Sequence, residues 1–157
     1  MDDTQILDRI AALGLELPPP PSPVAAYVAV RIAGDVAYVA GQVPMMDGHV
    51  MSPGRLGEMV RLDDAAVAAR QAALQALSAL RAALGSFERL RGISQVTVFI
   101  ASTPEFVDHP RVANGASEVL VEILGDAGKH ARAAVGMASL PLGASVEVVV
   151  VAELEPA

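Results

Sequence analysis

The sequence contains no cysteine, and this absence excludes several kinds of chemistry. Without thiols there is neither a disulfide framework nor a thiolate nucleophile. A zinc site would have to use other ligands, but His49, His109 and His130 show none of the HxxxH or HExxH spacings that are typical of metal sites. We therefore expect no resident metal ion.

Basic charge and aromatic rings are also scarce. The net charge is −7, the isoelectric point is about 4.8 and aromatic residues make up 3% of the chain. Such a chain repels polyanions and offers few rings on which bases could stack, so we expect no nucleic-acid partner. The only lysine, Lys129, follows Gly128 in a predicted loop, where a solvated side chain is more common than a Schiff-base nucleophile.

Long apolar runs are missing as well. The longest purely apolar segment, residues 24–30, is far shorter than the roughly 20 residues that a membrane-spanning helix needs. The first residues, MDDTQILDRI, are acidic and polar, whereas a signal peptide has a basic segment followed by an apolar one. These patterns predict a cytoplasmic protein without a membrane partner.

The motifs of several enzyme classes are absent. No GxSxG segment indicates a serine hydrolase, and GDAGKH contains a lysine without the GxxxxGK[ST] spacing of a phosphate-binding loop. No dinucleotide fingerprint is present either. We expect the protein to work without a cofactor.

The chain does contain enough apolar sequence for a substantial core. Hydrophobic residues make up 53% of its 157 residues, which predicts one domain and leaves apolar surface for a partner subunit. Residues 4–13 have the spacing of a short amphipathic helix, and four prolines at 18–21 favour a stiff connector over a recognition ligand. We therefore divide the chain into an N-terminal helix with a proline-rich connector, residues 1–22, and a main domain, residues 23–157.

The main domain alternates strand and helix signals. Valine-rich segments on both sides of Gly34 and Asp35 predict a β-hairpin, and the glycines and prolines between residues 44 and 62 predict a loop. The predicted strands are 24–33, 36–43, 94–101, 131–138 and 145–153, and the predicted helices are 63–84 and 110–124. The order ββαβαββ indicates an α+β fold in which both helices lie on one face of a mixed sheet.

The longer predicted helix has one apolar side. Asp63 is its expected N-cap, and Gly85 is its expected stop. The side chains expected to pack lie within an arc of about 140° and are Val67, Leu74, Leu77, Leu80 and Leu84. The polar residues that fall outside this arc are Gln71, Gln75 and Ser78.

Two charges stand in the otherwise small and apolar segment 131–152, ARAAVGMASLPLGASVEVVVVA. A charge in a β-rich core costs several kcal/mol unless a partner compensates it. Arg132 and Glu147 therefore either reach water or meet something at a site.

Three separated pieces of the chain resemble the RidA (YjgF) family of small imine and enamine deaminases. They are AYVAVRIAGDVAYVAGQVP at 26–44, RVANGASEVL at 111–120 and HARAAVGMASLPLGASVEVVVVAEL at 130–154. The resemblance implies a chorismate-mutase-like fold and a homotrimer with clefts between neighbouring subunits. The N-terminal helix and the LELPPPP segment resemble a subgroup of this family.

The resemblance also implies roles for single residues. Arg132 would hold a substrate carboxylate, and Glu147 would lie near the attacking water. Tyr27 matches the tyrosine of the family's first strand, Gly41 the glycine of its GQ turn and Asn114 the asparagine of its second helix. Each of these residues could instead have a structural role. Arg132 could form a salt bridge at the subunit boundary, and Glu147 could be a solvent-facing strand residue. Tyr27 could fill an interface, Gly41 could serve only the turn, and Asn114 could lie at a helix surface.

Two positions depart from the family pattern. Ala40 stands where many members have serine, and Ala134 stands where many have cysteine, two residues after the arginine. Both departures remove polar side-chain atoms from the implied cleft, while the backbone groups at these positions could still hold water.

The function that the resemblance implies is hydrolysis of 2-imino acids, and of the enamines that tautomerise to them, to 2-oxo acids and ammonia. A guanidinium binds a carboxylate through two parallel hydrogen bonds, and Glu147 could orient water or move a proton. One alternative, favoured by Ala40 and Ala134, is a trimer that binds a small carboxylate-bearing metabolite without turnover. Another is the endoribonuclease activity attached to family names, which the acidic chain disfavours.

Overall fold

The computed structural model of the protein describes residues 1–22 and 25–156. Pro23 and Val24, where we expected the main domain and its first strand to begin, lie outside the described residues. The helices are α1 (Asp3–Ala12), α2 (Leu62–Leu84) and α3 (His109–Leu124), and the main strands are β1 (Val30–Ala33), β2 (Val36–Gln42), β5 (Leu90–Ala101), β6 (Ala131–Met137) and β7 (Val146–Leu154). The short elements are β3 (Met45–Met46), β4 (His49–Val50) and two 3₁₀ turns, η1 (Gly125–Gly128) and η2 (Pro141–Gly143).

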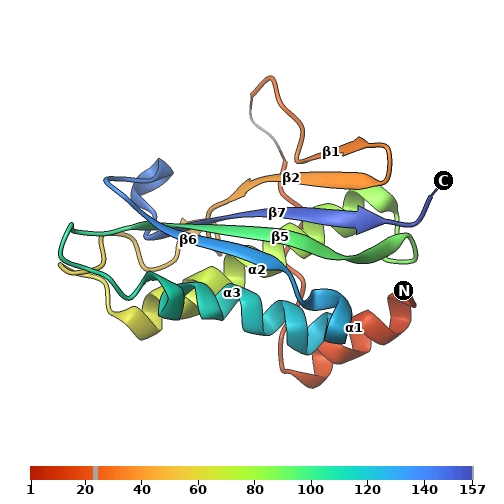
Figure 1. Ribbon diagram of the computed structural model, residues 1–157, viewed down its shortest axis with the longest axis horizontal. Helices are drawn as coiled ribbons and strands as arrows, with labels where there is room; N and C mark the ends of the chain where they lie inside the picture. The colour runs from red at the N-terminus through yellow and green to blue at the C-terminus, as the bar shows by residue number, and fades with distance from the viewer. Residues whose placement is uncertain (23–24, 157) are drawn as a thin grey trace.

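The five main strands form one mixed sheet in the order β1-β2-β7-β5-β6. Strands β5 and β6 are parallel and connected through α3, whereas the other neighbouring pairs are antiparallel. The predicted hairpin is present, because Ala33 pairs with Val36 across the turn. The mixed sheet of an α+β fold is therefore confirmed, with β1 and β6 at its two edges (Figure 1).

Two predicted strands and one predicted loop differ from the structure by more than a one-residue shift of a boundary. The first strand is shorter than expected, because β1 begins at Val30. Strand β5 begins at Leu90 rather than at Ser94, because its first residues pair with the end of β7 through two register shifts. The predicted loop 44–62 contains the β3–β4 hairpin, whose two-residue strands are too short to produce a periodic sequence pattern.

Helices α2 and α3 lie on one face of the sheet, as predicted (Figure 1). They pack closely, because Gly115 of α3 lies against the backbone carbonyl of Ala66 in α2, where a side chain would not fit. Helix α2 ends at Leu84, and Gly85 adopts the left-handed φ of 82° expected of a stop. Its N-cap is Arg61 rather than Asp63, which lies in the first turn near the positive end of the helix dipole.

The buried side of α2 is wider than the predicted arc. Leu74, Leu77 and Leu80 are buried as expected, but Val67 is 42% exposed, whereas Gln75 and Ser78 are each only 5% exposed. The prediction failed because α2 packs against more than the sheet. The amide of Gln75 bonds the backbone at Val43 and Met45, and the hydroxyl of Ser78 donates to the carbonyl of Pro18 at 2.6 Å.

The predicted N-terminal helix is present as α1, and it packs beside α3. Ile6 and Ile10 are buried in the core of the main domain, each 2% exposed. Asp3 accepts two hydrogen bonds from Arg81 of α2, at 3.0 and 2.8 Å, which lower the pKa of its carboxyl. Within residues 1–22 and 25–156 no helix has the length and apolar character needed to cross a membrane.

Within residues 1–22 and 25–156 the helices cover only one face of the sheet, and the other face carries apolar side chains together with Gln95, Thr97 and Glu147. The register places Tyr38, Val151 and Gln95 in one row across it, and Phe99 lies opposite Glu147 further along. Tyr38 is 50% exposed, in contrast to the fully buried valines of β7 that face the helices. A face of this kind is available to a partner subunit.

Candidate functional site

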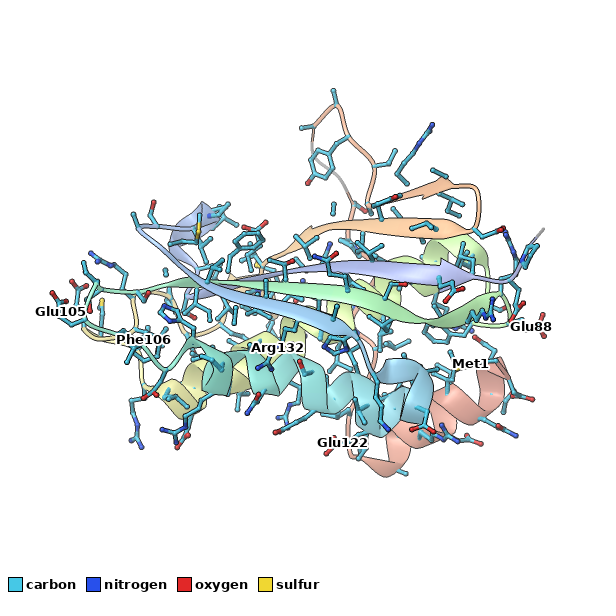
Figure 2. The ribbon with its side chains drawn as sticks, in the orientation of Figure 1. Met1, Glu88, Glu105, Phe106, Glu122 and Arg132 are labelled. Carbon is cyan, nitrogen blue, oxygen red and sulfur yellow. The ribbon has the colours of Figure 1, made fainter. Side chains whose placement is uncertain are left out.

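Arg132 lies near the start of the edge strand β6, between that strand and α3 (Figure 2). Its Nη1 donates hydrogen bonds to Oδ1 of Asn114 at 2.8 Å and to Oγ of Ser117 at 3.2 Å. Both acceptors are on α3, three residues apart and therefore on one side of the helix. Two of the predicted site residues, Arg132 and Asn114, are thus in direct contact.

These two bonds leave one edge of the guanidinium open. Nη1 carries two hydrogens, and both have an acceptor. For Nε and Nη2 of Arg132 the described part of the chain provides no hydrogen-bond or salt-bridge partner. The Nε–Nη2 edge is the fork that binds a carboxylate through two parallel bonds, and the side chain is exposed.

Ser117 connects this arginine to a histidine that the sequence analysis did not select. The Oγ of Ser117 lies 2.9 Å from Nε2 of His130, and Nδ1 of His130 lies 2.6 Å from the carbonyl of Gly128. A carbonyl only accepts, so Nδ1 carries a hydrogen, and in the tautomer whose single hydrogen is at Nδ1 the Nε2 atom accepts from the serine hydroxyl. A sequence signal existed, since Asn114 and Ser117 share one side of the predicted helix.

Glu147 and Gly41 form a second contact. Glu147, on the uncovered face of β7, places its carboxylate where a side chain at residue 41 would lie. Strand β2 has a bulge between Val39 and Gln42 at this point. A side chain at residue 41 would therefore displace the Glu147 carboxylate from its present position, and partial burial raises the pKa of that carboxyl.

The two contacts lie apart within one chain. Arg132 pairs with Val96 of β5, and Glu147 pairs with Phe99 of the same strand. The three-residue offset points their side chains to opposite faces of the sheet. Because β5 separates β6 from β7, the residues are also roughly 10 Å apart across the sheet and roughly 10 Å along it.

The structure also shows where the remaining residues singled out in the sequence lie. Tyr27 is 55% exposed and lies before β1, so its prediction as a strand residue was wrong. Ala134 follows Arg132 on the helix-facing side of β6 and packs partly against the core. Ala40 is half-buried beside the bulge of β2.

A comparison with protein families identifies the fold and its relatives. Residues 7–154 match the family described as YjgF/chorismate mutase-like, for which endoribonuclease is the suggested activity. The chain belongs to the YjgF/RidA family. Protein TCP17 of Trypanosoma cruzi is 40% identical over 151 residues, which cover 93% of this chain and 94% of that protein.

Solved structures of YjgF/RidA relatives share the chorismate-mutase-like fold. Atu1372 of Agrobacterium tumefaciens, a protein described as having unknown function, is 41% identical with a TM-score of 0.92, covering 98% of this chain and 94% of that one. RidA of an Antarctic Psychrobacter is 24% identical with a TM-score of 0.58, covering 85% and 93%. The second likeness shows the shared fold alone.

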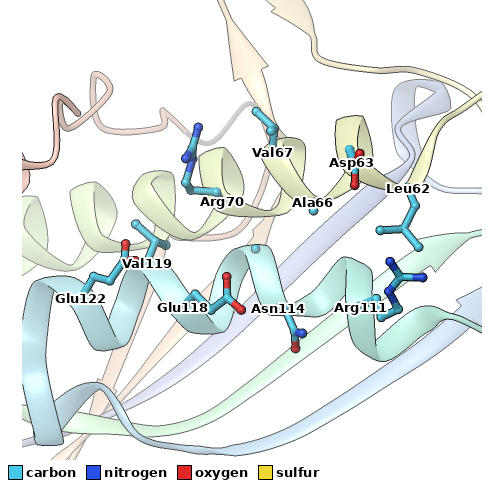
Figure 3. Close-up of a pocket in the computed structure, with 11 residues that line it drawn as sticks. Leu62, Asp63, Ala66, Val67, Arg70, Arg111, Asn114, Glu118, Val119 and Glu122 are labelled. Carbon is cyan, nitrogen blue, oxygen red and sulfur yellow. The ribbon is translucent and has the colours of Figure 1, made fainter.

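A groove between α2 and α3 has a volume of about 350 Å³ (Figure 3). Its charged residues are Asp63, Arg70, Arg111, Glu118 and Glu122. Three carboxylates outnumber the two arginines, so the net charge of the groove is negative. A groove of this charge repels a carboxylate ligand. Asn114 lines it too but points away from α2, toward the strands.

A second serine–histidine pair lies at the carboxyl ends of β5 and β6. Ser102 Oγ is 3.1 Å from Nε2 of His109, and a cavity of about 360 Å³ lies beside them. A Cβ on Gly136 would approach His109 Nε2 to 2.7 Å and Ser102 Oγ to 2.9 Å. Arg55 lines the cavity but donates to the backbone carbonyl of Ser102, not to its hydroxyl.

Lys129 has the solvent-exposed position that the sequence predicts. Lys129 is exposed and bonds Asp126 at 2.8 Å, which raises the pKa of Lys129, whereas a Schiff-base lysine needs a lowered one. Among residues 1–22 and 25–156, no group of three or more His, Asp and Glu side chains is arranged to hold a metal ion.

Proposed function

We propose that the protein hydrolyses reactive 2-imino acids, and the enamines that tautomerise to them, to 2-oxo acids and ammonia. Membership of the YjgF/RidA family supports this class of reaction. The observation that carries the proposal is the open Nε–Nη2 edge of Arg132, whose other nitrogen is held by Asn114 and Ser117. This edge matches the carboxylate that every 2-imino acid contains.

The remaining chemistry needs water and proton transfer. Water adds to the carbon of the C=N bond, and the resulting carbinolamine loses ammonia to leave the 2-oxo acid. In this proposal Glu147 takes a proton from the attacking water and returns it to the leaving nitrogen. A raised carboxyl pKa suits this role, because an acid–base group works best when its pKa is near the working pH.

We further propose that the working form is a homotrimer with its sites between subunits. Arg132 and Glu147 lie on opposite faces of one sheet, so one chain does not surround a small substrate with both. A neighbouring subunit can bring its own Glu147 to the Arg132 of the first. The uncovered face with its apolar side chains supports such an assembly, and light scattering should give three times the chain mass of 16.2 kDa.

The test is release of 2-oxo acid and ammonia from several freshly generated 2-imino acids. An amino-acid oxidase can supply the imino acid in the cuvette, with catalase present and the uncatalysed hydrolysis rate subtracted. Arg132→Ala is the control that should lose the acceleration. A protein that binds the 2-oxo acid but does not accelerate hydrolysis would instead be the non-catalytic binding trimer that Ala40 and Ala134 favour.

The family description favours endoribonuclease as a second candidate. The net charge of −7 argues against it, because binding of a polyanion depends on basic residues. RNA cleavage that copurifies with the oligomer and disappears in Arg132→Ala would support this candidate over the deaminase.

A further inference from the structure

We propose that Ser117 and His130 are positioning residues that fix which edge of the Arg132 guanidinium meets the substrate carboxylate. This inference rests on the proposed function, because it concerns the same carboxylate site. Neither residue needs to touch the substrate. Both act through the hydrogen bond from Arg132 Nη1 to Ser117 Oγ.

The direction of each bond in this relay follows from the groups involved. Arginine only donates, so Ser117 Oγ accepts from Arg132, and in the Nδ1–H tautomer of His130 the serine donates its own hydrogen to Nε2. His130 then donates from Nδ1 to the carbonyl of Gly128. In this tautomer every bond of the relay donates in the same direction, from the guanidinium to a backbone carbonyl.

The far end of the relay is firmly held. Gly128 ends the 3₁₀ turn η1 and is buried. It lies so close to the backbone of Leu120 and Val121 in α3 that a Cβ at this position would clash with both. Since α3 also carries Asn114 and Ser117, one helix holds both ends of the relay and the second acceptor of Arg132.

This arrangement determines the orientation of the guanidinium plane. Two acceptors on the two hydrogens of Nη1 fix both the position and the rotation of a planar group. Without Ser117 the guanidinium keeps only Asn114 and can pivot about that bond. The Nε–Nη2 edge would then meet the carboxylate in a range of orientations, which weakens two-point binding.

The experiment compares two replacements of one side chain. Ser117→Ala removes the hydroxyl, whereas Ser117→Thr retains the hydroxyl and adds one methyl group. We expect Ser117→Ala to raise KM for a 2-imino acid about 3- to 10-fold, with a smaller change in kcat, and Ser117→Thr to restore most of the loss. Circular dichroism and light scattering establish that both variants fold and assemble like the wild type.

A double-mutant cycle tests that the residues act in series. His130→Ala should raise KM when it is made in the wild-type protein. When it is made in the Ser117→Ala variant it should change KM little, because the relay is already broken. In Arg132→Ala, Ser117→Ala should have no further effect. Additive losses in both cycles would overturn the relay.

Binding of a 2-oxo acid, measured by calorimetry with 2-oxobutanoate, separates the inference from the proposed function. If the wild type turns over imino acids and Ser117→Ala has unchanged KM and Kd, the inference fails and the deaminase stands. If the wild type shows no turnover but binds 2-oxobutanoate more tightly than Ser117→Ala, the inference survives without the deaminase. If the wild type neither turns over nor binds these compounds, both are wrong.

Discussion

Two serine–histidine pairs lie at opposite ends of β6, and they differ in what surrounds them. At the amino end, Ser117 and His130 are 2.9 Å apart, and the same serine also accepts from Arg132. At the carboxyl end, Ser102 and His109 are 3.1 Å apart, and Ser102 is only 7% exposed. No side chain among the described residues gives Ser102 Oγ a second hydrogen bond.

The third partner makes the difference between the pairs. An exposed arginine with one open edge adjoins the first pair, whereas the second pair is packed against Gly136 and the Phe106 ring, which is roughly perpendicular to the His109 ring. We therefore expect changes at the amino end to alter substrate handling and changes at the carboxyl end to alter stability. The serine–histidine contact alone does not distinguish the two.

The largest expected effect is at the amino end. Arg132→Ala removes both bonds to the carboxylate and should lower kcat/KM by at least about 10-fold and up to about 100-fold or more, because each charge-assisted bond contributes roughly 1.5 to 3 kcal/mol. Arg132→Lys keeps the charge without the fork and should fall between. Steady-state kinetics and light scattering measure both properties. If Arg132→Ala dissociates the oligomer and turnover falls only in proportion, Arg132 is a boundary residue rather than an anchor.

At the carboxyl end, Gly136→Ala should be the more damaging of two changes. Its Cβ would press against Nε2 of His109 and Oγ of Ser102, so their hydrogen bond has to break or the strand has to shift. We expect a loss of roughly 1 to 3 kcal/mol in the free energy of unfolding, as for other overpacked sites. Urea denaturation measures it. Wild-type stability in this variant would mean that His109 moves aside easily and that the pair is not a structural element.

Ser102→Ala should have a smaller effect of the same kind. It leaves Nε2 of His109 without its partner, at a cost of about 1 kcal/mol in the free energy of unfolding. Ser139→Ala, at an exposed residue, is the matched control and should change stability little. The kcat/KM per folded oligomer should stay at the wild-type value. A selective loss of turnover in Ser102→Ala would give the carboxyl end a functional role and remove the contrast with Ser117.

The sequence predicted the order of elements well, because hydrophobic periodicity and glycine stops report on local structure. The pattern failed where distant segments meet. Gln75 and Ser78 are polar and fell outside the apolar arc of α2, yet they are buried because the segments at Val43 and Pro18 supply their hydrogen-bond partners. Such partners are distant in sequence, and no local period reveals them.

The candidate site likewise contains residues that the local sequence reveals and residues that only the folded structure brings together. Arg132 and Glu147 were noticeable as isolated charges in an apolar segment, but their placement on opposite faces depends on the register of β5 with both neighbours. Ser117 and His130 were missed because each residue is ordinary in its own segment. They become a pair only when α3 packs beside the start of β6.

The smallest expected effect concerns pH and Glu147 of β7, which pairs with Phe99 toward the carboxyl end of β5 and is part of the proposed site. Burial raises the pKa of its carboxyl in the folded protein above the ordinary value of 4.5, so the folded state holds this proton more tightly than the unfolded chain. The contribution of Glu147 to stability is therefore greatest below pH 4.5 and is lost as the pH rises through the raised pKa.

Glu147→Gln removes the titrating group and keeps its shape. We expect Glu147→Gln to raise the free energy of unfolding above that of the wild type by more at pH 7.5 than at pH 4. The control is Glu122→Gln, an exposed change on α3 that also removes one negative charge, and it should show a smaller difference between the two pH values. Urea denaturation at one fixed protein concentration measures this, because dissociation of an oligomer makes stability concentration-dependent. If Glu147→Gln instead destabilises the protein at pH 7.5, the ionised carboxylate has a stabilising partner in the assembly, and the role of proton carrier would pass to another group.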